Sequence, residues 1–308
     1  MSITLLENFR AVFYTPFYAA FSAGAFVEEG VDVRIETSPD PARNAELLMS
    51  GEAQVSWGGP MRVLVAYDKN PYCNLKVFCE VVCRDPFFLI GREPNPAFRM
   101  GDLVGPKVAT VSEVPTPWMC LQHDLQLAGL DPQALDRVPD KTMDENAEAL
   151  RAGAVDVVQV FQPFAEELIL EGAGHIWYQA AERGLTTYTA FYAPGSFLRD
   201  HPESALGMTR AMAKTELWLA DNDAEAVTEL VKPWFEDMDS YILMDAIERY
   251  KSLGLWNRNP RLAKESFNWL RAACLSGGLI TTGVSYEKAV DMRFVDNVWR
   301  RGGFSDFG

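Results

Sequence analysis

The stretch FYTPFYAAFSAGAFVEEGVDVRIE, residues 13–36, joins closely spaced aromatic residues to a run of small residues and then to alternating apolar and polar residues. The small residues of 16–26 predict a helix, and the alternation over 31–36 predicts a half-buried strand. Residues 3–9 predict a strand before them. Strand, helix and strand in this order are typical of a mainly parallel sheet with helices on both faces.

The same alternation continues along the chain in two similar halves. LMSGEAQV at 48–55 corresponds to LRAGAVDV at 150–157, because in each a predicted helix stops at a glycine and a buried strand follows. Two α/β lobes of Rossmann type are therefore predicted. We expect residues 1–91 and 190–308 to form the first lobe, residues 92–189 to form the second, and a hinge and a ligand cleft to lie between them.

From residue 202 onward the pattern is helical. Apolar residues at helical spacing predict helices over 203–222, 224–234, 240–253, 260–277 and 286–300. We expect this C-terminal segment to pack on the first lobe.

Composition and charge limit the classes of partner. The chain of 308 residues has a formal net charge of -15, which repels polyphosphate, so no nucleic-acid partner is expected. No apolar run approaches the roughly 18 residues that a membrane-spanning helix needs, so direct membrane insertion is not expected either. The predicted strand at 3–9 leaves no room for a leader, which indicates a cytoplasmic protein or a periplasmic protein whose leader was removed.

Residue types that carry metal, cofactor or nucleophilic chemistry do not cluster. Five cysteines at irregular spacing give no disulfide framework and are interpreted as buried thiols. The three histidines are not at metal-ligand spacing, and neither a nucleophile elbow nor a dinucleotide-binding GxGxxG motif occurs. No metal, no cofactor and no catalytic residue is therefore predicted.

Several short motifs together resemble one known family. The first half supplies PFYAA at 16–20, GAFVEEGVDV at 24–33 and LMSGEA at 48–53. The second supplies LVGPKVA at 103–109, AGLDP at 128–132 and ALRAGAVD at 149–156, and Pro202-Glu203 matches the return segment. In their order and spacing, over residues 3 to 235, these motifs resemble the SsuA/THI5-like (NMT1-like) substrate-binding proteins, which have the type II periplasmic-binding-protein fold.

The resemblance implies two lobes that close on a small organic molecule and, in most members, delivery of that molecule to the permease of an ABC importer. Relatives with this fold also include cytosolic enzymes, among them a pyrimidine synthase and aromatic-acid decarboxylases. The synthase branch has a histidine before its aromatic turn and a CCCFC run. Here Tyr14 takes the place of that histidine and no such run occurs, so that chemistry is not indicated.

Candidate ligand-binding residues follow from the turns at the carboxyl ends of the predicted strands, where sites form in such sheets. The aromatic turn supplies rings that can stack on a planar ligand, and the turn at 57–61 offers backbone N–H groups at a helix start. Three further segments complete the set of candidates. They are the facing turn at 112–116, the end of the strand at 161 and the start of the strand that is predicted to return the chain to the first lobe. The candidates are Phe13, Tyr14, Tyr18, Trp57, Gly58, Gly59, Met61, Ser112, Glu113, Thr116, Gln162 and Tyr188.

Two functions fit these features. The first is a substrate-binding protein for an aromatic, heterocyclic, carboxylated or sulfonated small molecule, with an ABC permease as partner and a monomer or weak dimer as the working form. The second is a cytosolic enzyme of the same fold, a decarboxylase, lyase or synthase, with Tyr14, Glu113 or His123 as acid–base candidates. Whether the chain is an enzyme is left open by the sequence.

Overall fold

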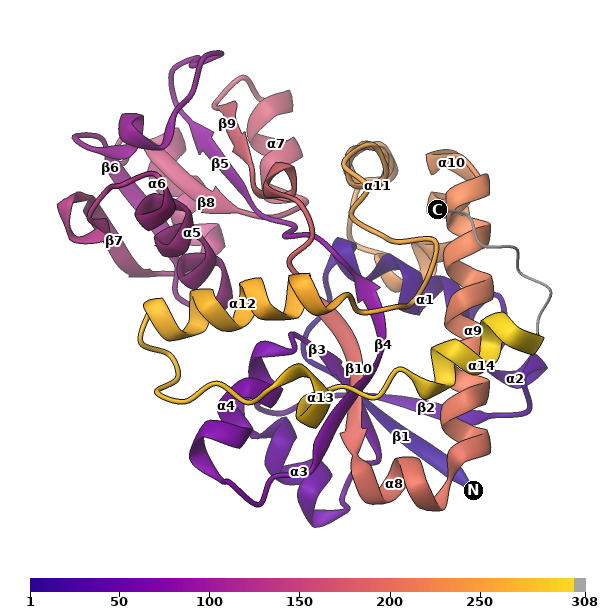
Figure 1. The fold of residues 1–308 in the computed structure, drawn as a ribbon. Helices are drawn as coiled ribbons and strands as arrows, with labels where there is room; N and C mark the ends of the chain where they lie inside the picture. The colour runs from indigo at the N-terminus through magenta and orange to yellow at the C-terminus, as the bar shows by residue number, and fades with distance from the viewer. Residues whose placement is uncertain (302–308) are drawn as a thin grey trace.

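The computed structural model describes residues 1–301, with side chains to residue 298. Two α/β lobes are each built around a five-stranded mixed sheet with helices against it, as Figure 1 shows. The predicted fold class is therefore confirmed. Residues 302–308, which were assigned to the first lobe from the sequence, lie outside the described part. No helix within residues 1–301 has both the length and the apolar character needed to cross a membrane.

The first sheet has the strand order β2-β1-β3-β10-β4. Its strands β1, β2 and β3 are parallel neighbours, and β10 is antiparallel to β3 and β4 on either side. The bounds are β1 Ser2–Glu7, β2 Asp32–Thr37, β3 Val55–Gly58, β4 Leu75–Val82 and β10 Thr189–Pro194. Strand β10 thus returns the chain to the first lobe after the second lobe is complete.

The second sheet repeats this plan with the order β7-β6-β8-β5-β9. Strands β6, β7 and β8 are parallel neighbours, and β5 is antiparallel to β8 and β9. The bounds are β5 Phe88–Gly91, β6 Lys107–Val111, β7 Asp136–Lys141, β8 Val157–Val160 and β9 His175–Gln179. Strand β5 was assigned to the first lobe from the sequence. Its pairing with β8 and β9 places the crossing between the lobes before Phe88 instead of after residue 91.

The helix predicted over residues 16–26 is present but divided in two. Gly24 has a left-handed φ of 71°, which ends α1 and separates it from a short second helix. The bounds in the first lobe are α1 Thr15–Ser22, α2 Ala25–Glu28, α3 Asn44–Ser50 and α4 Met61–Lys69, and in the second lobe α5 Thr116–Leu127, α6 Met143–Arg151 and α7 Phe164–Leu170.

The C-terminal segment is helical, as predicted, but it contacts both lobes. Helices α9 and α14 pack on the first lobe, whereas α11 packs against α7 and α12 against α5, along the boundary between the lobes in Figure 1. The bounds are α8 Gly195–Asp200, α9 Pro202–Asp221, α10 Ala224–Val231, α11 Ser240–Ser252, α12 Lys264–Ser276, α13 Tyr286–Ala289 and α14 Arg293–Arg301. The helix predicted over 286–300 is interrupted where Asp291 N–H donates to the carbonyl of Val77.

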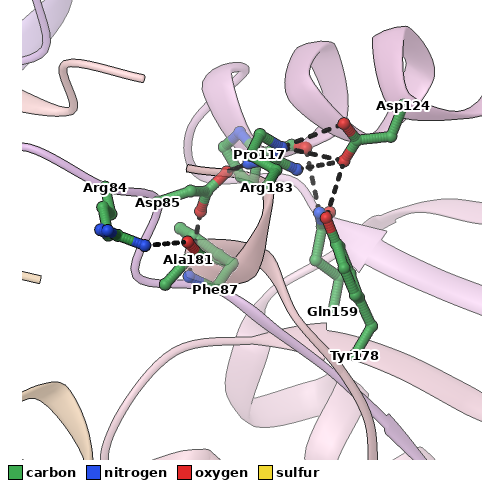
Figure 2. Close-up of polar contacts among 9 residues, drawn as sticks. All are labelled: Arg84, Asp85, Phe87, Pro117, Asp124, Gln159, Tyr178, Ala181 and Arg183. Atoms are coloured by element: carbon green, nitrogen blue, oxygen red, sulfur yellow. Dashed lines mark hydrogen bonds and ion pairs between the residues drawn. The ribbon is translucent and has the colours of Figure 1, made fainter. Parts of the chain in front are cut away.

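A buried ion cluster joins the two chain crossings of the hinge (Figure 2). Arg183, on the returning crossing, donates to Asp85 on the outgoing crossing at 2.6 Å and to both oxygens of Asp124 at 3.0 Å from Nε. Asp124 belongs to α5, so the cluster also fixes the second lobe. Burial raises the pKa of Asp85, and the positive charge of Arg183 opposes that rise.

Removal of Arg183 tests how much the folded state depends on this cluster. Arg183→Met leaves two buried carboxylates without their cation, and we expect it to lower the free energy of unfolding by about 3–5 kcal/mol. Urea unfolding followed by circular dichroism measures this loss. The matched control is Arg199→Met, because Arg199 pairs with Asp200 on the exposed surface, where such pairs contribute about 0–1 kcal/mol. Equal losses in the two variants would contradict a structural role for the cluster.

Two carboxyl groups lie in the core of the first lobe, and neither forms an ion pair with a cation of residues 1–298. Glu80 of β4 and Glu216 of α9 are 2% and 1% exposed. One oxygen of Glu80 and both oxygens of Glu216 have no hydrogen-bond partner among the described residues. Burial raises the pKa of Glu80 to about 8 and raises that of Glu216, which Glu80 raises further. Burial therefore favours the protonated form of both carboxyl groups.

A pH dependence of stability follows from Glu80. The folded protein keeps this proton up to about pH 8, whereas the unfolded chain releases it near pH 4.3, so stability decreases as pH rises between these values, by about 1.4 kcal/mol per pH unit for one group. Glu80→Gln removes the titrating group, and we expect a shallower decline in thermal and urea unfolding from pH 5 to 8. Glu229→Gln, an exposed change on α10, serves as the control. An unchanged slope in Glu80→Gln would show that Glu80 is ionised in the folded state.

Candidate ligand cleft

One cavity of about 930 Å³ lies between the lobes and has walls from both. Its volume is within the range of roughly 300–1,000 Å³ that is usual for ligand sites. The first lobe contributes the turn after β1, the segment 40–49 and one face of α4. The second lobe contributes residues 113–115, Met143 and the segment 161–164, and the C-terminal region adds Phe235, Met238 and Leu279.

The wall in the first lobe forms where the parallel strands β1 and β3 end. Asn44 of α3 donates to the side chain of Asn8 at 2.9 Å and to Ser56 at 3.1 Å, and Ser56 donates to the carbonyl of Leu6. These buried bonds join the ends of both strands to α3. A Cβ at position 58 would lie 2.6 Å from Asn8 Nδ2, so Gly58 is required for this packing. A buried network of hydrogen-bonded polar side chains thus positions this wall of the cleft.

Aromatic rings from the two lobes meet at the floor of the cleft. Phe9 of the first lobe and Phe161 of the second both line the cavity and stack in parallel, with centroids 6.2 Å apart. Phe13 meets Phe161 edge-on at 5.3 Å. The lobes are therefore in direct apolar contact below the space that a ligand would occupy.

Five rings that were predicted to line the cleft lie behind this floor. Phe13, Tyr14, Tyr18, Trp57 and Tyr188 are all buried, and none of them lines the cavity. Tyr14 and Tyr18 each pack against Trp57 with centroids 5.8 Å apart. Burial raises the pKa of Tyr14. The expected convergence of Tyr14 and Trp57 on the open cleft is not found, because the helices that cover the sheet enclose both rings.

Of the other three residues predicted in the first lobe, one lines the cavity and two do not. Met61 lines the cavity at the start of α4. Gly58 packs against Asn8, and the ideal Cβ position of Gly59 is 3.4 Å from the carbonyl oxygen of Tyr188, so neither glycine contributes to the cavity wall. The turn at 57–61 thus brings one of its predicted residues to the cleft and uses the rest to pack the strand ends.

In the second lobe the structure brings Glu113 and Gln162 to the cleft and leaves Ser112 and Thr116 outside it. Glu113 accepts a hydrogen bond from the N–H of Met143 at 2.9 Å, at the start of α6. The side-chain amide of Gln162 donates to Glu166 at 2.9 Å, and its oxygen accepts from the N–H of Glu166 at 3.0 Å. Both predicted polar residues therefore have partners within the protein.

One face of α4 lines the cavity, and of its residues only Met61 was predicted from the sequence. Arg62, Val65, Ala66 and Lys69 border the cavity as well and were not predicted. Their spacing of three and four residues is the signal that could have identified them, since it places them on one side of a helix. Phe9, Met143 and Phe164 are further lining residues that were not selected.

The acid–base candidates of the enzyme hypothesis do not meet. Tyr14 is buried behind the floor, Glu113 is bound to the start of α6, and His123 lies between α5 and α12, where its Nδ1 is 3.0 Å from Ser276 Oγ. Of the five buried cysteines, Cys73 lines the cavity, and burial raises its pKa, which favours the neutral thiol. Within the described residues no group of three or more His, Cys, Asp or Glu side chains is placed to hold a metal ion.

The placement of Trp57 predicts a structural role that can be measured. Trp57→Ala removes a fully buried ring, and we expect a loss of about 3–5 kcal/mol in the free energy of unfolding. Met49→Ala is the control, because Met49 also borders the cleft region but is 42% exposed, and surface changes usually stay within about 0.5 kcal/mol. Urea unfolding measures the loss in the free energy of unfolding for both variants. A loss for Trp57→Ala as small as that for Met49→Ala would place the ring outside the core.

The sequence matches one family model and one curated protein over most of its length. The family model described as "NMT1/THI5 like" matches residues 12–226. Among curated proteins, "Putative binding protein YtlA" of Bacillus subtilis (strain 168) is 27% identical over 301 residues, which cover 96% of this chain and 89% of that protein.

Solved structures share the fold at lower sequence identity. The periplasmic aliphatic sulphonate binding protein SsuA of Escherichia coli superimposes with a TM-score of 0.77 at 15% identity, covering 94% of this chain and 92% of that one. The desulfurization enzyme DSZB superimposes with a TM-score of 0.71 at 15% identity, covering 97% of this chain and 99% of that one. The same fold thus occurs in a binding protein and in an enzyme.

Proposed function

Because the chain belongs to the NMT1/THI5-like family, we propose that it is a substrate-binding protein that closes its two lobes over a small organic anion. The observation that carries this proposal is the cavity of about 930 Å³ whose walls come from both lobes. Most of its lining is apolar, and the cation Arg62 of α4 borders it without an ion-pair partner among the described residues. An apolar wall with few polar anchors is the usual composition of an organic-ligand site.

Closure follows from the position of the walls. A ligand that touches α4 in the first lobe and the segments 113–115 and 161–164 in the second makes both sets of contacts only when the lobes approach. Its differential affinity for that arrangement shifts the population toward it. The hinge cluster of Asp85, Arg183 and Asp124 keeps the two crossings together during this motion.

The proposed partner and location are supported by a relative of the same fold. SsuA of Escherichia coli is named a periplasmic sulphonate-binding protein. By the same arrangement we propose an ABC-importer permease as the partner of this chain and a location outside the cytoplasmic membrane. Carboxylates and sulfonates with an aromatic or heterocyclic body are the proposed ligands.

A thermal-shift panel tests binding. The panel contains aromatic and heterocyclic carboxylates, sulfonates and sulfinates, each paired with its uncharged amide. We expect at least one anion to stabilise the protein by about 2.7 kcal/mol at a hundred times its Kd, and its amide to do so less. Small-angle scattering should show a smaller radius of gyration with the bound anion, because closure brings the lobes together. A panel without a stabilising anion would contradict the proposal.

A cleft-filling variant links binding to the cavity. Ala66→Trp places a large side chain on the α4 wall, and we expect it to abolish the thermal shift while the circular dichroism spectrum is retained. Ala128→Trp, an exposed change at the end of α5, is the control and should keep the shift. An unchanged shift in Ala66→Trp would place the ligand elsewhere.

The alternative of an enzyme acting in the same cleft stays a prediction. It is tested by incubating the bound anion with the protein without added cofactor and analysing it by mass spectrometry. Recovery of unchanged anion supports the binding protein, and a product that is absent with Ala66→Trp supports the enzyme.

A further inference from the structure

One face of α4 presents two cations to the cleft with apolar residues between them. Arg62 and Lys69 border the cavity, and Val65 and Ala66 lie between them on the same face. Seven residues make two turns of helix, so the two positions are separated by about 10 Å along the axis. Arg62, in the first turn of α4, is half-buried, whereas Lys69, the last residue of this helix, is exposed.

Neither cation is neutralised within the part of the chain that the structure describes. Arg62 donates one hydrogen bond, from Nη1 to the carbonyl of Pro41 at 2.7 Å, and no ion pair or hydrogen bond of the Lys69 ammonium is found there. Arg10, which also borders the cavity, differs because it pairs with Glu7 at 2.8 Å and donates to the carbonyl of Trp234. Two cations on one helix face without an ion pair among the described residues are possible contacts for an anionic ligand.

The carboxylates that border the cavity already have partners. Asp40 accepts from the N–H of Ala42 at 2.9 Å, Glu46 lies 3.4 Å from Arg43, and Glu113 accepts from the N–H of Met143 at 2.9 Å. The bonds of Asp40 and Glu113 come from backbone N–H groups, which fix the two carboxylates in place and leave their charge. Arg62 and Lys69 are the cations of the wall that have no ion pair among the described residues, and an anionic ligand can provide that partner.

We propose that the ligand is an elongated dianion whose two acidic groups, at opposite ends of an apolar body, contact Arg62 and Lys69. This inference rests on the proposed function and specifies its ligand. The guanidinium fork of Arg62 suits two-point contact with the oxygens of a carboxylate or sulfonate, and the ammonium of Lys69 acts as a single point charge. The apolar body lies along Val65 and Ala66, facing the wall of the second lobe.

Isothermal titration with three probes tests this geometry. Biphenyl-4,4′-dicarboxylate has acid groups separated by about two helical turns, biphenyl-4-carboxylate lacks the outer group, and benzene-1,4-dicarboxylate is too short to reach both cations. We expect the long dianion to bind at least about tenfold more tightly than the other two. Added salt should weaken binding of the long dianion most, because it makes two charge contacts that salt can screen and the other probes make one.

Variants assign each end of the probe. Lys69→Met should reduce the affinity for the long dianion to that of the monoanion and leave the monoanion unaffected. Arg62→Met should weaken both. Lys107→Met, an exposed lysine at the start of β6 in the other lobe, should change neither. Because Lys69 is exposed, we expect Lys69→Met to fold normally, so this variant tests the inference even if Arg62→Met folds poorly.

The outcomes separate this inference from the proposed function. Equal affinities for the long dianion and the monoanion, with no effect of Lys69→Met, overturn the dianion and leave the binding protein standing. The dianion is likewise overturned, and the binding protein stands, if a monoanion of the thermal-shift panel binds and the dianions do not. If no anion of that panel binds, the proposed function fails together with the inference.

Discussion

The buried contact of Arg183 with Asp85 and Asp124 is the constraint on which the arrangement of the lobes depends. Asp85 and Arg183 lie on the two segments that cross between the lobes, and Asp124 lies on α5. A buried carboxylate without its cation is costly, so the two crossings must stay side by side and α5 must stay against them. The guanidinium of Arg183 also lies 5.0 Å above the ring of Trp269 in α12. One cation thus fixes both crossings, the second lobe and a C-terminal helix.

The C-terminal helices extend this constraint toward the cleft. Arg249 of α11 pairs with Glu166 of α7, and Glu166 holds the side chain of Gln162, which borders the cavity. On the other side, His123 of α5 contacts Ser276 of α12. A change of the angle between the lobes must therefore move α7 and α5 relative to α11 and α12. The C-terminal segment does more than cover the first lobe, because it also contacts α5 and α7 of the second.

The architecture could be predicted from the sequence because local patterns determine it. The repeated order of strands and helices gave both lobes, and glycine stops such as Gly51 and Gly153 marked corresponding helix ends. The assignment of residues 88–91 to a lobe failed, because a short apolar strand is compatible with either sheet and only its partners decide.

The direction of the aromatic side chains could not be predicted from the sequence either, because it too depends on contacts with distant parts of the chain. Tyr14 and Trp57 do lie near the ends of their strands, yet whether a ring faces the cleft or the core depends on helices far along the chain. Tyr18 is covered by Trp234 and Phe235, more than 200 residues away in the sequence. The α4 face is different, since the spacing of residues 61, 62, 65, 66 and 69 is visible in the sequence, although only Met61 was predicted to line the cleft.

The contact between Phe9 and Phe161 has a consequence for the energetics of binding. These rings already bridge the lobes beneath the cavity, so apolar burial at the floor is present before any ligand arrives. A ligand adds contacts only along the walls above, and only those contacts can shift the equilibrium between open and closed lobes. Because a purely apolar wall contact would favour many compounds alike, discrimination among them must come from the polar groups of the walls. The carboxylates Asp40 and Glu113 there already accept backbone hydrogen bonds, so we propose the cations Arg62 and Lys69 of α4 as the groups that distinguish one anion from another.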